Sequence, residues 1–226
     1  MAGRKNFVAG EILTAADVNS FLMDQSVMVF DDSAARGSAI PTPSEGMVTY
    51  LKSDDQVTVF DGAAYKPVGG LVNVKSAIFT GTQSASVTGG GNLAVTDLSI
   101  THEVADPANK LIISAFLGAA GNSDRRRNVG IAVDDGSGLI AVGDAAGSRT
   151  RVSAGGFGGA SDIRAVTMPS VTFVHTPGAG SKTYTVRAIN IEVQTRTLFI
   201  NRPESNDDNA SMPRAVSSLV IQEVAV

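Results

Sequence analysis

The amino-acid sequence predicts a mainly β protein in which a small N-terminal helix-plus-hairpin module precedes a β-sandwich head of jelly-roll type. The main observation is that residues 75–226 contain roughly eight to ten short apolar runs, separated by Gly- and Pro-rich turns and without helical periodicity. A second observation is the pair Gly69-Gly70, where the character of the sequence changes. We therefore expect a module at residues 1–68, a Gly-containing linker at 69–74 and the head at 75–226.

The first element is a short helix, predicted at residues 14–25. Thr14 followed three positions later by Asp17 is a capping-box start, in which a hydroxyl and a carboxylate satisfy free N–H groups of the first turn. Apolar residues then recur at spacings of three and four and form a narrow stripe: Val18, Phe21 and Leu22. About three turns are too few for a helix that is stable alone in water, so another surface must bury this stripe.

The next elements are extended. Val27 to Phe30 is a predicted strand. Residues 31–40 are predicted as a turn that can include one helical turn, and Pro41 and Pro43 end it. Residues 47–60 contain two strand-like runs separated by four polar residues, the pattern of a β-hairpin. We expect Tyr65 to fold back onto this hairpin.

Three strings of the opening segment occur in a characteristic order: LTAADVNSFLMDQSVMVFDDSAAR, PSEGMVTYL and VTVFDGAAY. In them the chain closely resembles the N-terminal region of tail and fibre proteins of tailed bacteriophages, over about the first 68 residues. The resemblance implies a virion structural protein, made in the host bacterial cytoplasm, that docks onto other phage structural proteins through residues 1–68. The candidate docking residues are Val18, Phe21, Leu22, Val27 and Val29.

Strand patterns in the head are of two kinds. Residues 98–104 alternate between apolar and polar, which predicts one buried and one solvated face. Residues 110–117 are more continuously apolar, as expected for a central strand covered on both sides. The final run, residues 219–226, is predicted to pair inside a sheet. The strand number and this last strand also resemble the trimeric heads of phage fibres, which implies a homotrimer.

Composition sets limits on the function. Aromatic residues are 5% of the chain and Gly numbers 24, so the core is thin for its length and oligomerisation would compensate. The net charge of −4 is scattered along the chain, which argues against a nucleic-acid groove. With no Cys there is no thiolate zinc site, and the longest apolar stretch is about half a membrane span. We expect no secretory signal, no membrane insertion and no cofactor.

Several polar groups have a structural explanation that we prefer to a catalytic one. His102 and His175 lack partners at metal-ligand spacing, and His102 occupies an apolar position of its strand. The acidic pairs at 54–55, 134–135 and 207–208 lie in predicted turns, where Asp accepts backbone N–H bonds, rather than in a calcium loop. One cluster is a candidate contact for an anion, although a solvated loop or an ion pair between subunits is preferred: Arg125, Arg126 and Arg127.

Two loops are candidates for receptor contact. The segment 155–160 places Phe157 between glycines and is predicted to be a mobile surface loop. The segment 201–214 is a long polar excursion between two strands. Its candidate contact residues are Arg202, Glu204, Asn206, Asp207, Asp208 and Asn209.

These observations favour a non-enzymatic phage virion protein, a tail fibre or minor tail protein whose head contacts a glycan or protein of the host surface. One alternative is a capsid-attached head fibre or decoration protein. Another is a head that cleaves host carbohydrate, which would require a paired acid and base. The candidate carboxylates for that chemistry show no pairing signal in the sequence: Glu103, Glu192, Glu204 and Glu223.

Overall fold

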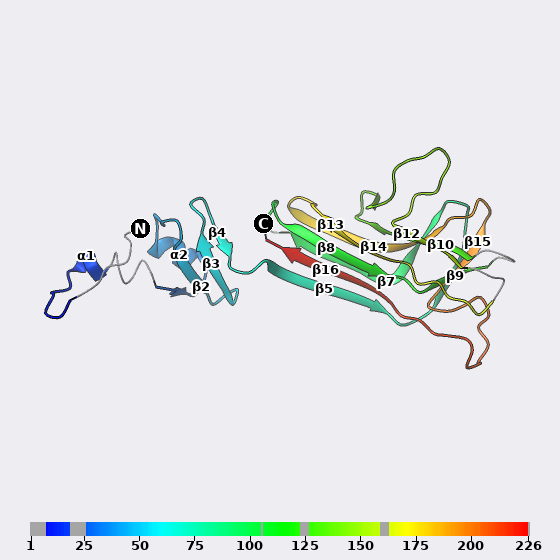
Figure 1. Cartoon of the computed structure of the whole chain (residues 1–226), viewed down its shortest axis with the longest axis horizontal. Coiled ribbons are helices and arrows are strands. Elements are labelled where there is room, and N and C mark those ends of the chain that lie inside the picture. The colour runs from blue at the N-terminus through cyan, green and yellow to red at the C-terminus, as the bar shows by residue number, and fades with distance from the viewer. Residues whose placement is uncertain (1–7, 19–25, 105, 123–126, 159–162, 226) are drawn as a thin grey trace. The chain divides into compact units, whose positions relative to one another are not determined.

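The computed structural model describes residues 8–18, 26–104, 106–122, 127–158 and 163–225 (Figure 1). The chain divides into two compact units, one ending at Val72 and the other beginning at Asn73. We call them the N-terminal unit and the head. The prediction of a mainly β protein with a sandwich head is confirmed.

The described part of the first helix is its N-terminal turn. Helix α1 (Ala15–Asp17) begins after Thr14, whose Oγ1 accepts the Asp17 N–H at 3.1 Å. The Asp17 carboxylate in turn accepts the Thr14 N–H at 3.2 Å, which completes the capping box. The rest of the predicted helix, including Phe21 and Leu22, lies outside the described residues.

A four-stranded sheet with the order β1-β2-β3-β4 forms the core of the N-terminal unit. Its strands are β1 (Met28–Phe30), β2 (Val48–Leu51), β3 (Gln56–Phe60) and β4 (Tyr65–Pro67). Pairing of Leu51 with Gln56 leaves a four-residue hairpin turn, and Tyr65 pairs with Phe60. Helix α2 (Ser33–Ala39) is tied to the sheet by Arg36, which donates to Thr58 Oγ1 at 3.0 Å and covers the Tyr65 ring.

The head contains two large sheets and one small sheet (Figure 1). The first large sheet has the order β13-β8-β16-β5, from β13 (Ser170–His175), β8 (Lys110–Phe116), β16 (Ser217–Val224) and β5 (Leu71–Phe79). The second has the order β11-β10-β14-β7, from β11 (Leu139–Ile140), β10 (Arg127–Asp134), β14 (Gly180–Asn190) and β7 (Asn92–Val104), and β12 (Ala154–Gly158) also pairs with β10. The small sheet consists of β6 (Gln83–Val87), β15 (Arg196–Ile200) and β9 (Ala119–Gly121).

The strand order is that of a jelly roll. Taken in chain order, the eight principal strands are β5, β7, β8, β10, β12, β13, β14 and β16. One sheet contains β5, β16, β8 and β13 side by side, which are the first, eighth, third and sixth of these strands. The other contains β7, β14, β10 and β12, which are the second, seventh, fourth and fifth. Two interlocked Greek keys produce this order: the chain crosses to the facing sheet at every connection except the one from β10 to β12, which pair within one sheet.

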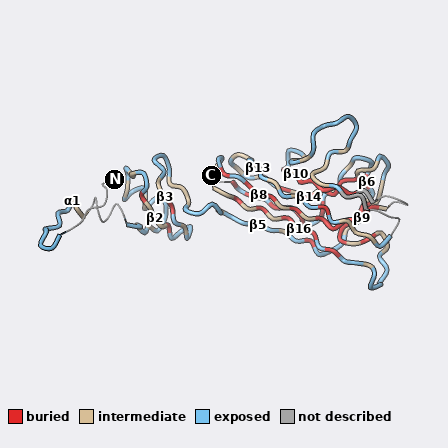
Figure 2. The backbone as a smooth tube through the Cα atoms, viewed as in Figure 1, coloured by how far each residue is buried: buried red, intermediate tan, exposed pale blue. Residues whose placement is uncertain are grey.

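The core lies between the two large sheets, where alternate residues of each strand face inward (Figure 2). Strand β8 buries Leu111, Ile113 and Ala115, while its intervening residues are partly exposed. These residues pack against inward positions of the opposite sheet, such as Ile131 and Val186. Along β8, inward and outward residues therefore alternate with the period of two that is expected for a strand.

Two sequence predictions need correction. The predicted linker at 69–74 is only partly a linker, because β5 already begins at Leu71. The predicted mobile loop at 155–160 begins as strand β12, which pairs with β10 from Gly158 to Ala154. The close packing is at the facing Gly130 of β10, where a Cβ would lie 2.4 Å from Val152 Cγ1.

Candidate interaction surfaces

Among the described residues, strand β1 is an open edge of the sheet in the N-terminal unit. Val27 and Val29 are each 56% exposed although both are β-branched apolar residues. Beside them lies a hollow of about 480 Å³, lined by residues 26–30 of the β1 region and by Ala39 and Ile40 at the end of α2. An unpaired strand edge with exposed valines can accept an extended segment or an apolar side chain of a partner.

The structure describes three of the five candidate docking residues. Val27 and Val29 lie together at the open edge, on the same side of β1. Val18 is half-buried and lies in the segment that follows α1. The structure therefore brings two of the predicted residues together beside one hollow.

Six polar side chains meet between the two sheets of the head, and we call them the polar layer: His102, Asn109, Asp135, His175, Lys182 and Glu223. The layer lies where β7, β13 and β16 end and β14 begins. In one sheet Lys182 on β14 is the cross-strand neighbour of His102 on β7. In the other sheet Leu111 on β8 has His175 of β13 as its cross-strand neighbour on one side and Glu223 of β16 on the other. Both histidines of the chain thus belong to a single layer of the sandwich.

One half of the polar layer is centred on Glu223, which is 2% exposed. Its Oε2 lies 2.8 Å from His102 Nε2, and its Oε1 accepts a hydrogen bond from Asn109 Nδ2 at 2.7 Å. His102 is fully buried, as its apolar register predicts, and its other ring nitrogen has no hydrogen-bond partner. Both carboxylate oxygens are therefore engaged inside the head.

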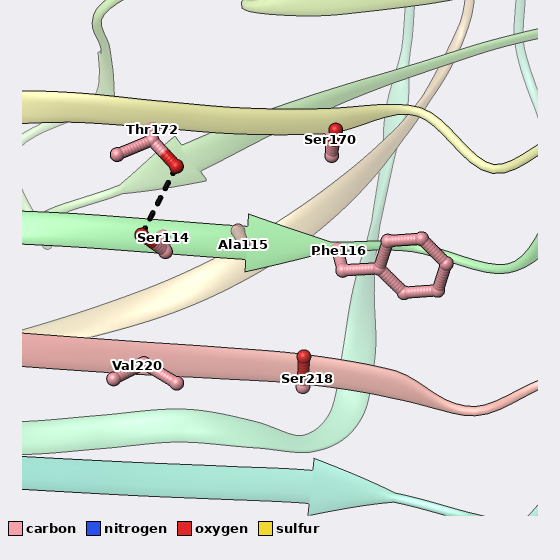
Figure 3. Close-up of a pocket in the computed structure, with 7 residues that line it drawn as sticks. All are labelled: Ser114, Ala115, Phe116, Ser170, Thr172, Ser218 and Val220. Carbon is pink, nitrogen blue, oxygen red and sulfur yellow. Dashed lines mark hydrogen bonds between the residues drawn. The ribbon is translucent and has the colours of Figure 1, made fainter.

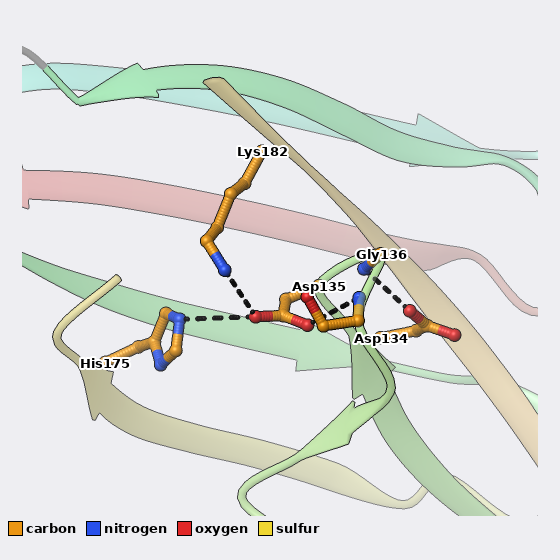
Figure 4. A network of polar contacts seen from close by, with 6 residues as sticks. Asp134, Asp135, Gly136, His175 and Lys182 are labelled. Atoms are coloured by element: carbon orange, nitrogen blue, oxygen red, sulfur yellow. Dashed lines mark hydrogen bonds and ion pairs between the residues drawn. The ribbon is translucent and has the colours of Figure 1, made fainter. Parts of the chain in front are cut away.

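The other half is centred on Asp135, whose Oδ2 accepts a hydrogen bond from Lys182 Nζ at 3.0 Å (Figure 4). His175 Nε2 lies 3.9 Å from the same oxygen, and the His175 ring meets the Tyr184 ring edge to face. Burial acts to raise the pKa of Asp135, but the hydrogen bonds from Lys182 and from the Ser137 N–H outweigh it and lower the pKa. Burial raises the pKa of Tyr184 to about 12, with a further contribution from Asp135.

The polar layer resembles a structural network more than a reaction centre. Its carboxylates are occupied by the layer's own donors, and no serine, threonine or cysteine lies among the six side chains. Across the described ranges, no three His, Cys, Asp or Glu side chains lie close enough together to hold a metal ion. Asp134 and Asp135 also accept the N–H groups of Gly136 and Ser137, which is the turn chemistry that the sequence favours.

The head should lose stability as the pH falls through the titration range of His175. Burial lowers the pKa of His175 below 6.5; Asp135 opposes this shift and Lys182 adds to it. The unfolded chain therefore binds the proton more readily, so the free energy of unfolding decreases as pH drops below about 6.5. Urea unfolding measured from pH 8 to pH 5 tests this, because carboxylates remain largely ionised over that range.

The matched variant for this test is His175→Gln, which keeps a polar group near Asp135 but removes the titration. We expect a flatter dependence of stability on pH in the variant than in the wild type. An identical dependence in both proteins would show that His175 makes no such contribution.

The candidate receptor loop at 201–214 is fixed at its base and exposed at its tip. Asn201 is buried with φ +57°, and its Nδ2 donates to Phe79 O at 2.7 Å and Gly81 O at 2.9 Å. Its Oδ1 accepts the Ser217 hydroxyl at 2.6 Å, which ties the loop to the start of β16. Four candidate residues lie on the exposed tip: Asn206, Asp207, Asp208 and Asn209.

The remaining candidates are placed differently. Arg202 stacks over the Phe199 ring at 4.5 Å and donates to the carbonyls of Pro203 and Glu204, so it stabilises the loop base. Glu204 is half-buried. Arg127 begins β10 and Phe157 lies in β12, on neighbouring strands, whereas Arg125 and Arg126 lie outside the described residues.

The connectivity and the core define the protein as a jelly-roll head carried on a small separate unit. No protein-family model and no curated protein match the chain. Among solved structures, the chain is similar to one in the "Structure of infectious bursal disease virus Gx strain", with 9% sequence identity and a TM-score of 0.32. The match covers 74% of this chain and 46% of that chain, so the chain spans less than half the viral protein's length. A likeness at this level does not bear on function.

Within the described ranges, no helix is long and apolar enough to cross a membrane.

Proposed function

We propose that this chain is a non-enzymatic structural protein of a tailed-bacteriophage virion, a tail fibre or minor tail protein. In this proposal the N-terminal unit docks onto other virion proteins, and the jelly-roll head, as a homotrimer, is presented to the host surface. The resemblance of residues 1–68 to phage attachment regions motivates the proposal. The observation that carries it is the open β1 edge, where Val27 and Val29 lie exposed beside an apolar hollow.

Two features of the head support the presenting role. The loop tip at 206–211 is exposed on a base that Asn201 holds rigidly, which is the arrangement in which a β-scaffold carries recognition loops. The buried carboxylates of Glu223 and Asp135 are engaged by neighbouring side chains of the polar layer, which supports a role without catalysis.

Placing a charge at the open edge should prevent docking without unfolding the chain. In the double variant Val27→Asp and Val29→Asp, we expect at least a tenfold loss of protein copies per particle, because an unpaired carboxylate would be desolvated in the interface. Quantitative mass spectrometry of purified particles measures the copy number. A chain that lacks residues 1–68 should fold as a head and fail to join particles.

The matched control is Val193→Asp in the head, since Val193 is 89% exposed. It makes the same Val-to-Asp change once rather than twice and should leave the copy number unchanged. If the edge variant entered particles as well as this control, the docking assignment would be wrong.

A further inference from the structure

The outer side of sheet β13-β8-β16-β5 differs from an ordinary solvated sheet surface. Its outward apolar side chains, which we call the apolar outer face, are Ile78, Ile112, Phe116, Val174, Val220 and Val224. They lie on four adjacent strands, and Ile78 and Val174 are each 62% exposed. Serine and threonine side chains fill most of the positions between them.

Charge is nearly absent from this side. Among the outward positions of the four strands, whose residues are all described, Lys110 at one end carries the one charge. The outer side of the opposite sheet has hydroxyl pairs, Ser99–Thr185 at 2.7 Å and Thr101–Thr183 at 2.8 Å, as this side has Ser114–Thr172 at 3.0 Å. The opposite sheet also carries the ion pair Arg187–Asp134 at 3.0 Å. Depletion of charge on one side alone is characteristic of the centre of a protein interface.

The pattern of β8 supports the same conclusion. The continuous apolar run of residues 110–117 predicts a central strand covered on both sides. Strand β8 is central in its sheet, but only its inner side is covered within the head. Ile112 and Phe116 remain partly exposed on the other side. The sequence is therefore that of a strand whose second cover comes from outside the described part of the head.

The face carries both a hollow and a large side chain. A hollow of about 200 Å³ lies over β8, bounded by the small side chains of Ser114, Ser170, Thr172 and Ser218 (Figure 3). The larger Phe116 side chain stands at its margin, between Ser170 and Ser218 on the neighbouring strands. A ring and a hollow at different points of one face can be satisfied around a threefold axis, where the ring of each copy meets the hollow of the next.

We propose that the apolar outer face binds a second copy of this chain. The chain carries a net charge of −4, so an uncharged face is where two copies can approach without repulsion. Four strands about 4.8 Å apart, each contributing about seven residues of ~3.3 Å, give a face of roughly 450 Å² per copy. Three such faces bury about 1,350 Å² over three contacts, or about 450 Å² for each pair of copies, which is less than a stable pair of separate proteins requires.

Because this area is small, the contact between heads depends on the N-terminal units as well. The inference rests on the proposed homotrimer, which it deepens by naming the face through which heads meet. Docked N-terminal units would hold the heads at a high local concentration, and a face too small for isolated heads then becomes sufficient.

Cysteine cross-linking of the full chain tests the proposal, because the natural chain contains no Cys. Ser218→Cys places a thiol on the apolar outer face, and Thr183→Cys places one on the opposite sheet. With a short bismaleimide, we expect at least a tenfold higher yield of covalent dimer from Ser218→Cys, because the contact holds its thiols together. Equal yields from both positions would indicate random collision and overturn the proposal.

A second pair of variants controls for the position of the thiol. Adding Ile78→Lys and Val174→Lys to Ser218→Cys should abolish the excess cross-linking, because like charges would meet in the contact. Adding Ser181→Lys to Ser218→Cys should leave the excess cross-linking unchanged, because Ser181 is exposed on the opposite sheet.

Cross-linking of Ser218→Cys to a different virion protein, instead of to a second copy, would overturn the proposal and identify that protein as the occupant of the face. If the chain enters particles but gives no excess cross-linking, the contact between heads is wrong and the attachment proposal stands. If the chain cross-links but does not enter particles, the attachment proposal is wrong and the contact between heads stands.

Discussion

Replacing Glu223 with alanine should lower the free energy of unfolding of the head by about 3–5 kcal/mol, because it removes one partner from a buried network. Glu223 accepts hydrogen bonds at both carboxylate oxygens, one toward the buried His102 ring and one from Asn109. Without the carboxylate, both donors lose their partner in a region that water does not reach. The lost packing of the side chain adds to this cost.

The measurement is urea unfolding at pH 7, followed by circular dichroism. The matched control is Gln222→Ala, one residue earlier on β16 and facing the other side of the sheet, which should cost less than about 1 kcal/mol. Glu223→Gln should fall between the two, since it keeps one acceptor and loses the charge. Equal stability of the Ala variants at 222 and 223 would show that the network is not energetically important.

The sequence predicted those parts of the fold that depend on neighbouring residues. The hairpin turn, the Thr14–Asp17 capping box and the alternation along β7 all arise from contacts within a few residues of chain. The apolar register of His102 likewise predicted its burial. These features share a local cause, so a single sequence contains the information for them.

The polar layer was missed because its partners are distant in sequence. His102 and Glu223 are separated by 121 residues and meet only because the jelly-roll connections bring β7 and β16 onto facing sheets. One local signal could have indicated it: Glu223 continues the buried register of Leu219 and Ile221. A carboxylate at an inward strand position requires a buried hydrogen-bond donor. The chain contains only two histidines, so few histidines could be that donor.

The glycine-rich segment at 155–160 shows a different limit. Glycine is read from sequence as flexibility, but Gly155 is a paired strand residue of β12, and the Gly130 that faces it on β10 permits a close approach of the chain. Gly155 pairs with Gly130, and Val152 packs over the space that their missing side chains leave. Which of the two roles a glycine has depends on what faces it, and that depends on tertiary structure.

Replacing Asn201 with alanine should destabilise the head by about 2–4 kcal/mol and loosen the loop at 202–214 more than the rest of the head. The change removes three side-chain hydrogen bonds, to Phe79 O, to Gly81 O and from the Ser217 hydroxyl. It also places an alanine at φ +57°, a conformation that asparagine tolerates better because its side chain can bond locally. Both effects act at the base of the loop.

Hydrogen exchange separates the global effect from the local one. We expect amides of residues 205–215 to exchange faster in the variant than a uniform loss of stability explains, because the anchor between the β5–β6 turn and β16 is gone. The control is Asn209→Ala at the exposed tip, where Asn209 only accepts bonds from Ser211 and no anchor is lost. If the loop presents a recognition surface, Asn201→Ala should weaken attachment to host cells without changing any exposed residue, whereas a purely global loss of stability would leave attachment by the folded fraction unchanged.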